Sequence, residues 1–387
     1  MRRALTAVAL ALAVATAAGL AILWPGHTET RIAADVSVDT QKAEVVEVRE
    51  SICPALGTQR CQLATARLKS GSGAGRRVQL QLSALQGFDP DLDPGDEILV
   101  TRGAKPPPGQ APVAGPEYSF YDFQRGTPLA VLAIAFALIV LVFARLRGAL
   151  SLLGLVASLA LVLVFVVPAI LDGKSPLAVA VVGALAVALI TIPLAHGRGT
   201  KTLAAILGTA ASLLLTALLA LIFTKATHLT GFSNEEAAFL DLAGANISLE
   251  GMLLAGMVIA ALGVLDDVTV SQASTVLALR TANPNLGFGG LFRLAQRVGR
   301  DHVSATVNTL VLAYVGAALP VLLLFSSSDL SFGQALSTET VATQIVGTLV
   351  GSIGLIAAVP LTTVLATALA LEEDPVALAA SDNDHAH

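Results

Sequence analysis

The feature that most constrains this chain is a series of apolar runs, each long enough to cross a bilayer. A helix rises about 1.5 Å per residue, so roughly 20 apolar residues span a hydrocarbon core of about 30 Å. Lipid offers no hydrogen-bond partners to the backbone, so each run is expected to be an α-helix. There are eight runs, at residues 4–24, 128–144, 149–170, 177–194, 202–223, 247–265, 303–325 and 341–371.

The composition agrees with an all-α polytopic membrane protein of about eight transmembrane helices. The 387 residues are 55% hydrophobic and only 13% charged, whereas soluble domains carry about 25% charged residues. The net charge of −5 and the absence of a basic run argue against a nucleic-acid partner. The lipid bilayer is the first partner that this composition implies.

The basic residues predict the orientation, because loops on the cytoplasmic side are enriched in Lys and Arg. With the N-terminus inside the cell, the inner segments hold ten basic residues and the short outer loops only Lys174 and Lys225. The ten are Arg2, Arg3, Arg145, Arg147, Arg198, Lys201, Arg280, Arg293, Arg297 and Arg300. We therefore expect a plasma-membrane protein with both termini in the cytoplasm and residues 25–127 outside.

The predicted organisation has five parts. Residues 1–24 form a signal-anchor helix, for which a cleaved signal peptide is the alternative. Residues 106–127 are a Pro-rich linker that ends in interfacial aromatics (Tyr118, Phe120, Tyr121 and Phe123). Residues 128–371 hold seven membrane helices, and residues 372–387 are an acidic cytoplasmic tail.

Residues 25–105 differ from the rest and predict an exported β-rich domain. Val78, Leu80 and Leu82 alternate with glutamines, which is strand periodicity. A small barrel or sandwich, OB-like in form, fits this length. Cys53 and Cys61 close a short loop in a compartment that permits disulfides, so a structural disulfide is expected. Metal binding is the less favoured reading, because no His or acidic cluster accompanies them.

The stretch LGVLDDVTVSQAST, residues 262–275, places two acids and several hydroxyls behind an apolar run. At helical spacing Asp267 shares a face of small and polar residues, including Ser271 and Ser274, and is predicted to point into the bundle. Asp266 lies beside a mostly apolar face and is predicted at the rim, with Thr269 as a further secondary residue. An inward carboxylate could carry a cation or a proton. The alternative is that Asp267 marks the membrane boundary.

The next apolar run carries Asn308 and Tyr314. An amide inside lipid is costly unless it bonds another helix, so Asn308 is expected either in an interhelical bond or on a polar pathway with Asp267. No zinc, P-loop or serine-hydrolase motif occurs. We therefore predict neither an enzyme, nor a metal site, nor a cofactor.

Four blocks resemble the YibE/F-like family of multi-pass bacterial membrane proteins. They are LGVLDDVTVSQAS, ANP, VGRDHVSATVNTLVLAYVGAALP and VGSIGLIAAVP, and the resemblance covers residues 128–371. In the family pattern a single acid falls at Asp267 and a recurring serine at Ser271, whereas Asp266 departs from that pattern. The resemblance implies the membrane architecture but names no substrate.

Two functional hypotheses follow. The first is a secondary transporter or permease for an ion or small molecule that uses the inward carboxylate. The second is a non-transporting membrane component whose exported β-domain recruits a partner protein. A homo-oligomer is compatible with either hypothesis.

Overall fold

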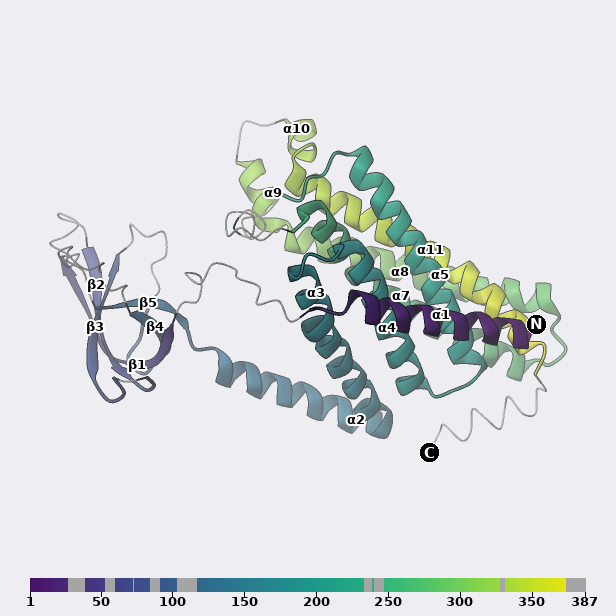
Figure 1. Ribbon diagram of the computed structural model, residues 1–387, viewed down its shortest axis with the longest axis horizontal. Helices are drawn as coiled ribbons and strands as arrows, with labels where there is room; N and C mark the ends of the chain where they lie inside the picture. Colours follow the sequence, from purple (N-terminus) through teal and green to yellow (C-terminus); the bar gives the residue numbers. More distant parts are fainter. Residues whose placement is uncertain are drawn as a thin grey trace. The chain divides into compact units, whose positions relative to one another are not determined.

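A computed structural model shows two compact units, one helical and one built on a sheet (Figure 1). It describes residues 1–26, 39–52, 60–71, 73–83, 91–102, 117–232, 239, 247–327 and 331–373. The helical unit comprises Met1–Ile32 and Phe143–His387, and the sheet unit comprises Ala33–Val142. Cys53, half of the predicted linker and nearly all of the acidic tail lie outside the described residues, so the disulfide stays a prediction.

The sheet unit contains one antiparallel sheet of five strands in the order β3-β2-β1-β4-β5. The two outer strands of this order, β3 and β5, also contact each other, so the sheet curls. The predicted alternation around Leu80 is confirmed as β3, in which Val78, Leu80 and Leu82 are all buried. The strands are β1 (Thr40–Ile52), β2 (Arg60–Leu68), β3 (Arg77–Ser83), β4 (Glu97–Arg102) and β5 (Tyr118–Phe123).

The expected aromatic belt is a strand instead. Tyr118 is 2% exposed and belongs to the sheet's core, against which Phe120 and Phe123 also pack. Only Tyr121 of this group is largely exposed. Assigning these aromatics to an interfacial linker was therefore wrong for Tyr118, because pairing with β4 turns this side chain inward.

The helical unit is built mainly from long helices (Figure 1). A π-helical turn (Val162–Val166) and α3 (Val167–Leu171) continue α2. The other helices are α1 (Arg2–Leu23), α2 (Gly126–Leu161), α4 (Pro176–His196), α5 (Thr200–Ala226), α7 (Leu249–Ala282), α8 (Phe288–Ala317), α9 (Leu319–Ser326), α10 (Phe332–Leu336) and α11 (Glu339–Ala370). The first part of α2, up to Val142, belongs to the sheet unit.

Among the described residues, six helices are long and apolar enough to cross a membrane, or seven if α8 and α9, bent by 62°, count as one span. Two of the predicted runs merge in a 46-residue stretch, Gly126–Leu171. Its helical backbone is interrupted at Arg145, where φ is 48°. The span predicted at 247–265 continues as helix to Ala282, so the two acids lie within α7 and not at its end.

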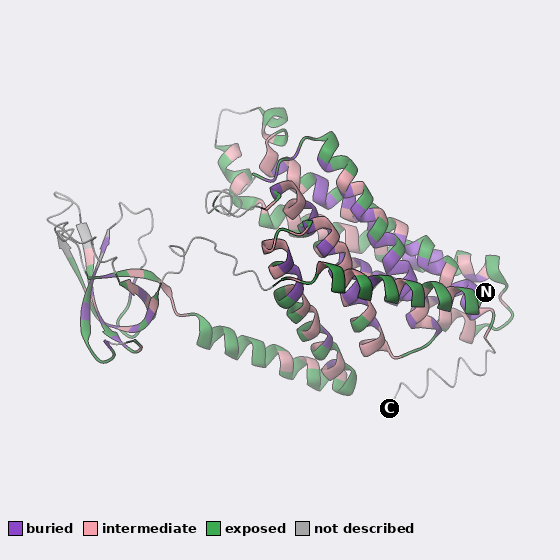
Figure 2. Ribbon diagram, viewed as in Figure 1, coloured by how far each residue is buried: buried purple, intermediate pink, exposed green. Residues whose placement is uncertain are grey.

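The centre of the helical unit is formed by α5, α7 and α11, which pack closely on one another. The buried residues of α5 and α11 are mostly small or hydroxyl-bearing, those of α7 are mostly large and apolar, and large side chains such as Leu214 and Ile356 are exposed. Figure 2 shows buried and exposed residues alternating along these helices. A Cβ on Gly208 of α5 would overlap Thr362 of α11, and a Cβ on Gly354 of α11 would overlap Thr216 of α5. These two close approaches show that α5 and α11 pack in antiparallel directions.

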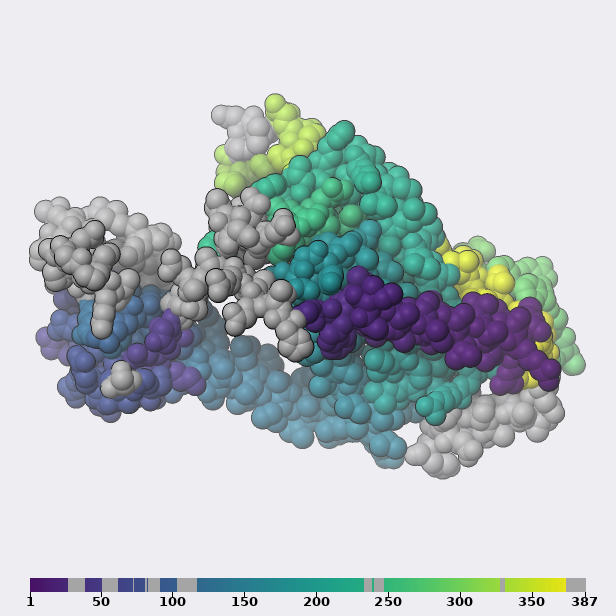
Figure 3. All heavy atoms as spheres, in the orientation of Figure 1, coloured from purple at the N-terminus to yellow at the C-terminus, as the bar shows by residue number. Residues whose placement is uncertain are grey.

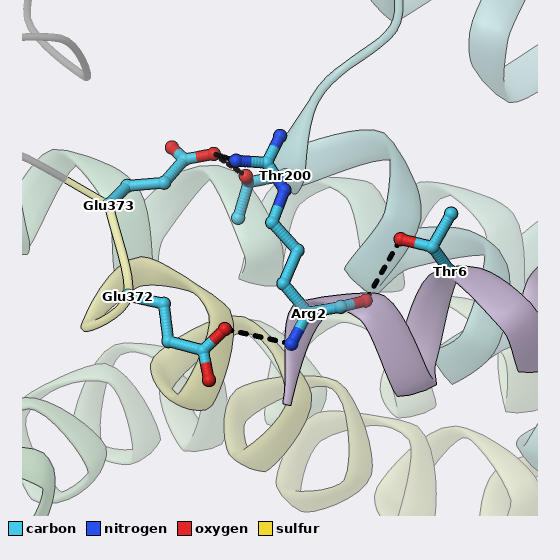
Figure 4. Close-up of polar contacts among 5 residues, drawn as sticks. All are labelled: Arg2, Thr6, Thr200, Glu372 and Glu373. Atoms are coloured by element: carbon cyan, nitrogen blue, oxygen red, sulfur yellow. Dashed lines mark hydrogen bonds and ion pairs between the residues drawn. The ribbon is translucent and has the colours of Figure 1, made fainter.

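The first helix lies along the surface of the helical unit, against α4 and α5 (Figure 3). Thr16 is its only buried residue. Its start is tied to the chain just after α11 (Figure 4). The Arg2 backbone N–H donates to Glu372 at 2.7 Å, and the Arg2 guanidinium pairs with Glu373 at 3.0 Å. The start of α1 and the end of α11 therefore lie on the same side of the unit.

Candidate functional site

Two carboxylates meet in a cavity of about 290 Å³ between three helices of the helical unit. The second part of α2 contributes Ser151, Gly154, Leu155 and Ser158, and α4 contributes Thr191, Ile192, Ala195 and His196. The floor comes from α7, with Gly263, Asp266, Asp267 and Val270. The wall residues from α2 and α4 include three hydroxyls and one imidazole, so the cavity is polar on both sides of the acids.

The structure reverses the predicted placement of the two acids. Asp266 is half-buried, and its helical neighbours Leu262 and Ala273 are fully packed. Asp267 is exposed, as are Gly256 and Gly263 on the same face. A Cβ on either glycine would meet nothing within 4 Å. The face of small residues therefore borders cavities, and Asp267 lines one of them instead of packing against another helix as expected.

The contacts of Asp266 join α7 to α4. Thr191 lies 3.4 Å from Asp266 Oδ2 through its hydroxyl, which also donates to the Val187 carbonyl at 2.9 Å. The other carboxylate oxygen, Oδ1, is buried and has no hydrogen-bond partner among the described residues. Buried carboxylate oxygens are normally hydrogen-bonded, so an oxygen without a partner is unusual. It can accept a hydrogen bond from a ligand or a water.

The surroundings of Asp267 are more open. Within the described ranges no ion pair includes either acid. His196 at the end of α4 interacts electrostatically with Asp267 and also with Arg147 and Lys201. The cavity lining therefore combines the exposed Asp267 carboxylate with the His196 imidazole.

The remaining residues predicted on α7 do not join this cavity. Thr269 is fully buried and lies 2.6 Å from Thr209 of α5, hydroxyl to hydroxyl, so it links two helices. Ser271 is half-buried and donates to the Val268 carbonyl of its own helix at 3.1 Å. Ser274 is also half-buried and does not line the cavity. Ser271 and Ser274 therefore do not continue a row of hydroxyl groups from Asp267 along the described lining of this cavity.

Asn308 and Tyr314 lie elsewhere. Asn308 is exposed on α8 and shares no cavity with Asp267. Tyr314 lines a separate cavity of about 300 Å³ between α7, α8 and α11, together with Gly256 and Gln344. Among the described residues the predicted polar pathway from Asp267 to Asn308 is not formed, because Asn308 is exposed and neither it nor Tyr314 lines the cavity of Asp267.

Sequence reasoning missed the wall of the cavity. Ser151 and Ser158 are two turns apart on α2, and Thr191 and His196 lie near the end of α4. Isolated hydroxyls are common in membrane helices, because they can bond the carbonyl one turn before, as Ser158 does with Gly154 at 2.9 Å. The spacing of Ser151 and Ser158 predicts that they share one face of their helix, but it does not identify the helix against which that face packs.

The fold and the apolar helices define a multi-pass helical membrane protein with a small antiparallel sheet unit. The YibE/F-like protein family matches residues 132–372, which is more than half of the chain, and the chain belongs to this family. The match spans α4 to α11 and both acids of the cavity. Neither the curated proteins nor the solved structures provide a match.

Proposed function

We propose that this protein is a secondary transporter or permease that moves a cation or a proton through the cavity lined by Asp266 and Asp267. The observation that carries the proposal is the half-buried carboxylate of Asp266, which has one oxygen near Thr191 and one without a partner among the described residues. Ionisable groups inside membrane helices are costly, and they usually mark ion or proton routes.

The roles of the two acids follow from their surroundings. Asp266 holds the ion, because it is the more buried acid and has a hydroxyl of α4 beside it. Asp267 attracts the ion to the cavity mouth, where it is exposed near His196. Thr191 orients Asp266, and Ser151 and Ser158 supply further oxygens on the opposite wall. Oxygen ligands of this kind suit hard cations.

The packing of α5 against α11 supports transport independently. The segments GTAASLLLT (208–216) and GLIAAVPLT (354–362) begin with a glycine, end with Leu-Thr and share an alanine at the fourth position. Each glycine faces the other segment's threonine, so the two segments are related as antiparallel equivalents. Antiparallel equivalent helices at the centre of a bundle are characteristic of transporters built from inverted repeats.

We further infer eight spans. The long Gly126–Leu171 stretch accounts for two of them, one before and one after Arg145. At 46 residues it would extend about 69 Å, roughly twice the hydrocarbon thickness. The start of α1 and the end of α11 lie on one side, and the excess of basic residues assigns that side to the cytoplasm. The strands of the sheet unit are then exported, and the curled five-stranded sheet fits an OB-like barrel.

The orientation is tested by labelling cysteines in intact cells after Cys53 and Cys61 have been replaced by serine. A cysteine at Glu50, in β1, should react with an impermeant thiol reagent, and one at Asn285, between α7 and α8, should react only after lysis. Reversed labelling would overturn the orientation. Equal labelling of both sites in intact cells would contradict the odd number of crossings that the proposed topology places between them.

The transport proposal is tested with the purified protein in liposomes that contain a pH-sensitive dye. Gradients of Na⁺ or K⁺ should drive a proton flux or be dissipated by the wild-type protein. Asp266→Asn should abolish this flux, and Asp267→Asn should lower it by about tenfold, the loss expected for one electrostatic contribution of about 1.4 kcal/mol. Asp301→Asn, on the exposed face of α8, is the matched control and should be silent. An Asp266→Asn protein as active as wild type would remove the carboxylate from the mechanism.

A partner-recruiting role remains the second candidate, and one observation favours it. A cavity of about 370 Å³ opens on the sheet unit between β3 and β5, lined by Arg76, Arg77, Gln79, Glu117 and Tyr118, with three apolar residues of β2 and β3. Charged groups around a cavity on a soluble unit suit a polar ligand. If the liposomes show no flux under any gradient while a charge change at Arg77 disturbs growth, this second function is the better account.

A further inference from the structure

The first half of α8 carries a row of arginines on one face. Arg293, Arg297 and Arg300 follow one another at spacings of four and three residues, so they lie on the same side of the helix. All three are exposed. The Arg293 side chain donates to the Gly289 carbonyl of its own helix at 3.1 Å. None of the ion pairs formed within the described residues includes any of the three.

The opposite face of this segment is fixed to the bundle. Leu291, Ala295 and Gly299 are buried against α7 and α11. The Gln272 amide of α7 donates to the Ala295 carbonyl at 3.0 Å and to the Thr363 hydroxyl of α11 at 2.7 Å. The arginines are therefore held in place on a firmly packed helix, and their orientation does not depend on a loop.

The length of α8 puts these arginines next to the bilayer surface. The helix has 30 residues, which is about 45 Å, whereas the hydrocarbon core is about 30 Å thick. The apolar part runs from Val303 onward, so the segment with the arginines extends through the headgroup region. Phe288 and Phe292 stack at 6.2 Å near its start, and Phe288 is half-exposed, as aromatic residues at a membrane interface often are.

We propose that the face formed by Arg293, Arg297 and Arg300 binds the headgroups of anionic phospholipids in the inner leaflet. Guanidinium groups bind phosphate through paired N–H donors, and an unpaired row of them beside a membrane complements a negative lipid surface. Asp301, one turn after Arg297, is the nearby opposing charge on this helix and weakens the attraction. The assignment to the inner leaflet depends on the proposed orientation of the protein, but the predicted lipid binding does not.

The binding is tested with the full chain in non-ionic detergent, titrated with phosphatidylglycerol or with phosphatidylcholine of the same acyl chains. Native mass spectrometry counts the bound lipids. Phosphatidylglycerol should bind preferentially and more weakly as salt rises, because salt screens exposed charges. Each arginine replaced by glutamine should lower the affinity by about fivefold, so Arg297→Gln/Arg300→Gln should lower it by about 25-fold. Asp301→Asn should raise it.

The matched control is Arg3→Gln/Arg198→Gln, which removes two exposed arginines elsewhere in the helical unit and should leave the affinity within about twofold of wild type, since distant sites act independently. Unchanged thermal stability in phosphatidylcholine verifies that the variants fold. Equal binding of the two lipids would overturn the proposal and favour an acidic protein partner. Equal losses in the two double variants, or displacement of the lipid by millimolar inorganic phosphate, would also overturn it.

Discussion

The sheet unit and the helical unit are built on opposite rules. The core of the sheet unit holds large side chains, among them Leu68, Leu80, Ile98 and Tyr118. In the helical unit, α5 and α11 meet through glycines, alanines and threonines, alongside buried leucines such as Leu213 and Leu355, while other leucines, such as Leu214 and Leu349, are exposed. Water drives large apolar groups inward in the first case. In lipid that force is missing between helices, so close packing of small residues and hydroxyl contacts holds them together.

The comparison teaches that one kind of substitution should act in opposite ways in the two units. Removing volume should destabilise the sheet unit, whereas adding volume should destabilise the helical unit. Two substitutions test this contrast, and a third measures how little an exposed ion pair adds to the sheet unit beside its buried core.

The largest effect is expected from Leu80→Ala in β3. Leu80 is fully buried in the sheet core, and truncation of a buried leucine costs about 2–5 kcal/mol through lost transfer energy and a residual cavity. Hydrogen exchange of peptides from β1 and β2 in the full chain should accelerate accordingly. Leu63→Ala, on the exposed side of β2, is the control and should change exchange little. Equal effects of the two would contradict a water-driven core.

Gly354→Ala should come next. Its new Cβ would overlap Thr216 of α5, which is itself fully buried, and overpacking of a tight contact costs about 1–3 kcal/mol. The thermal midpoint of the purified protein should fall, and adding Thr216→Ala should restore part of it. Gly256→Ala on α7 has no neighbouring atom within 4 Å and should be nearly silent. If both glycine variants are silent, α5 and α11 do not pack as closely as described.

The smallest effect is expected from Glu97→Gln in β4, which removes an exposed ion pair. Lys69 holds the pKa of Glu97 below its ordinary value of 4.5, and Glu97 raises the pKa of Lys69 above its ordinary 10.5. A lowered acid pKa stabilises the fold above pH 4.5 and ceases to do so as pH falls through the lowered value. A raised lysine pKa stabilises below pH 10.5 and ceases to do so as pH rises through the raised value.

Hydrogen exchange of β4 should therefore differ slightly between wild type and Glu97→Gln at neutral pH, and the difference should vanish in acid below the lowered pKa. Glu50→Gln removes the same charge from β1, where the described residues give it no ion pair, and it is the control. A difference that persists unchanged into acid would show that the Lys69–Glu97 contact contributes nothing.

The success of prediction differed between the units for a physical reason. Alternation found β3 because its inward residues are large, but it missed β2, whose inward residues Ala64 and Ala66 are too small to produce a hydrophobic signal. It also missed β5, because aromatics next to an apolar run resemble a membrane interface. Long apolar helices need no partner to be recognised, and the family blocks on them were identified correctly.

The sequence alone determined the class of the protein, the positions of its helices and the two acids worth attention, because length, apolarity and charge are local properties. Tertiary structure decided which acid is buried. The spacing on α7 placed Asp267 among small residues, and such a face can either pack against a helix or border a cavity. Only the position of α2 and α4 shows that it borders a cavity, and that Thr191 approaches Asp266. The burial of a residue depends on the segments that pack around it, and the periodicity of one helix does not specify those segments.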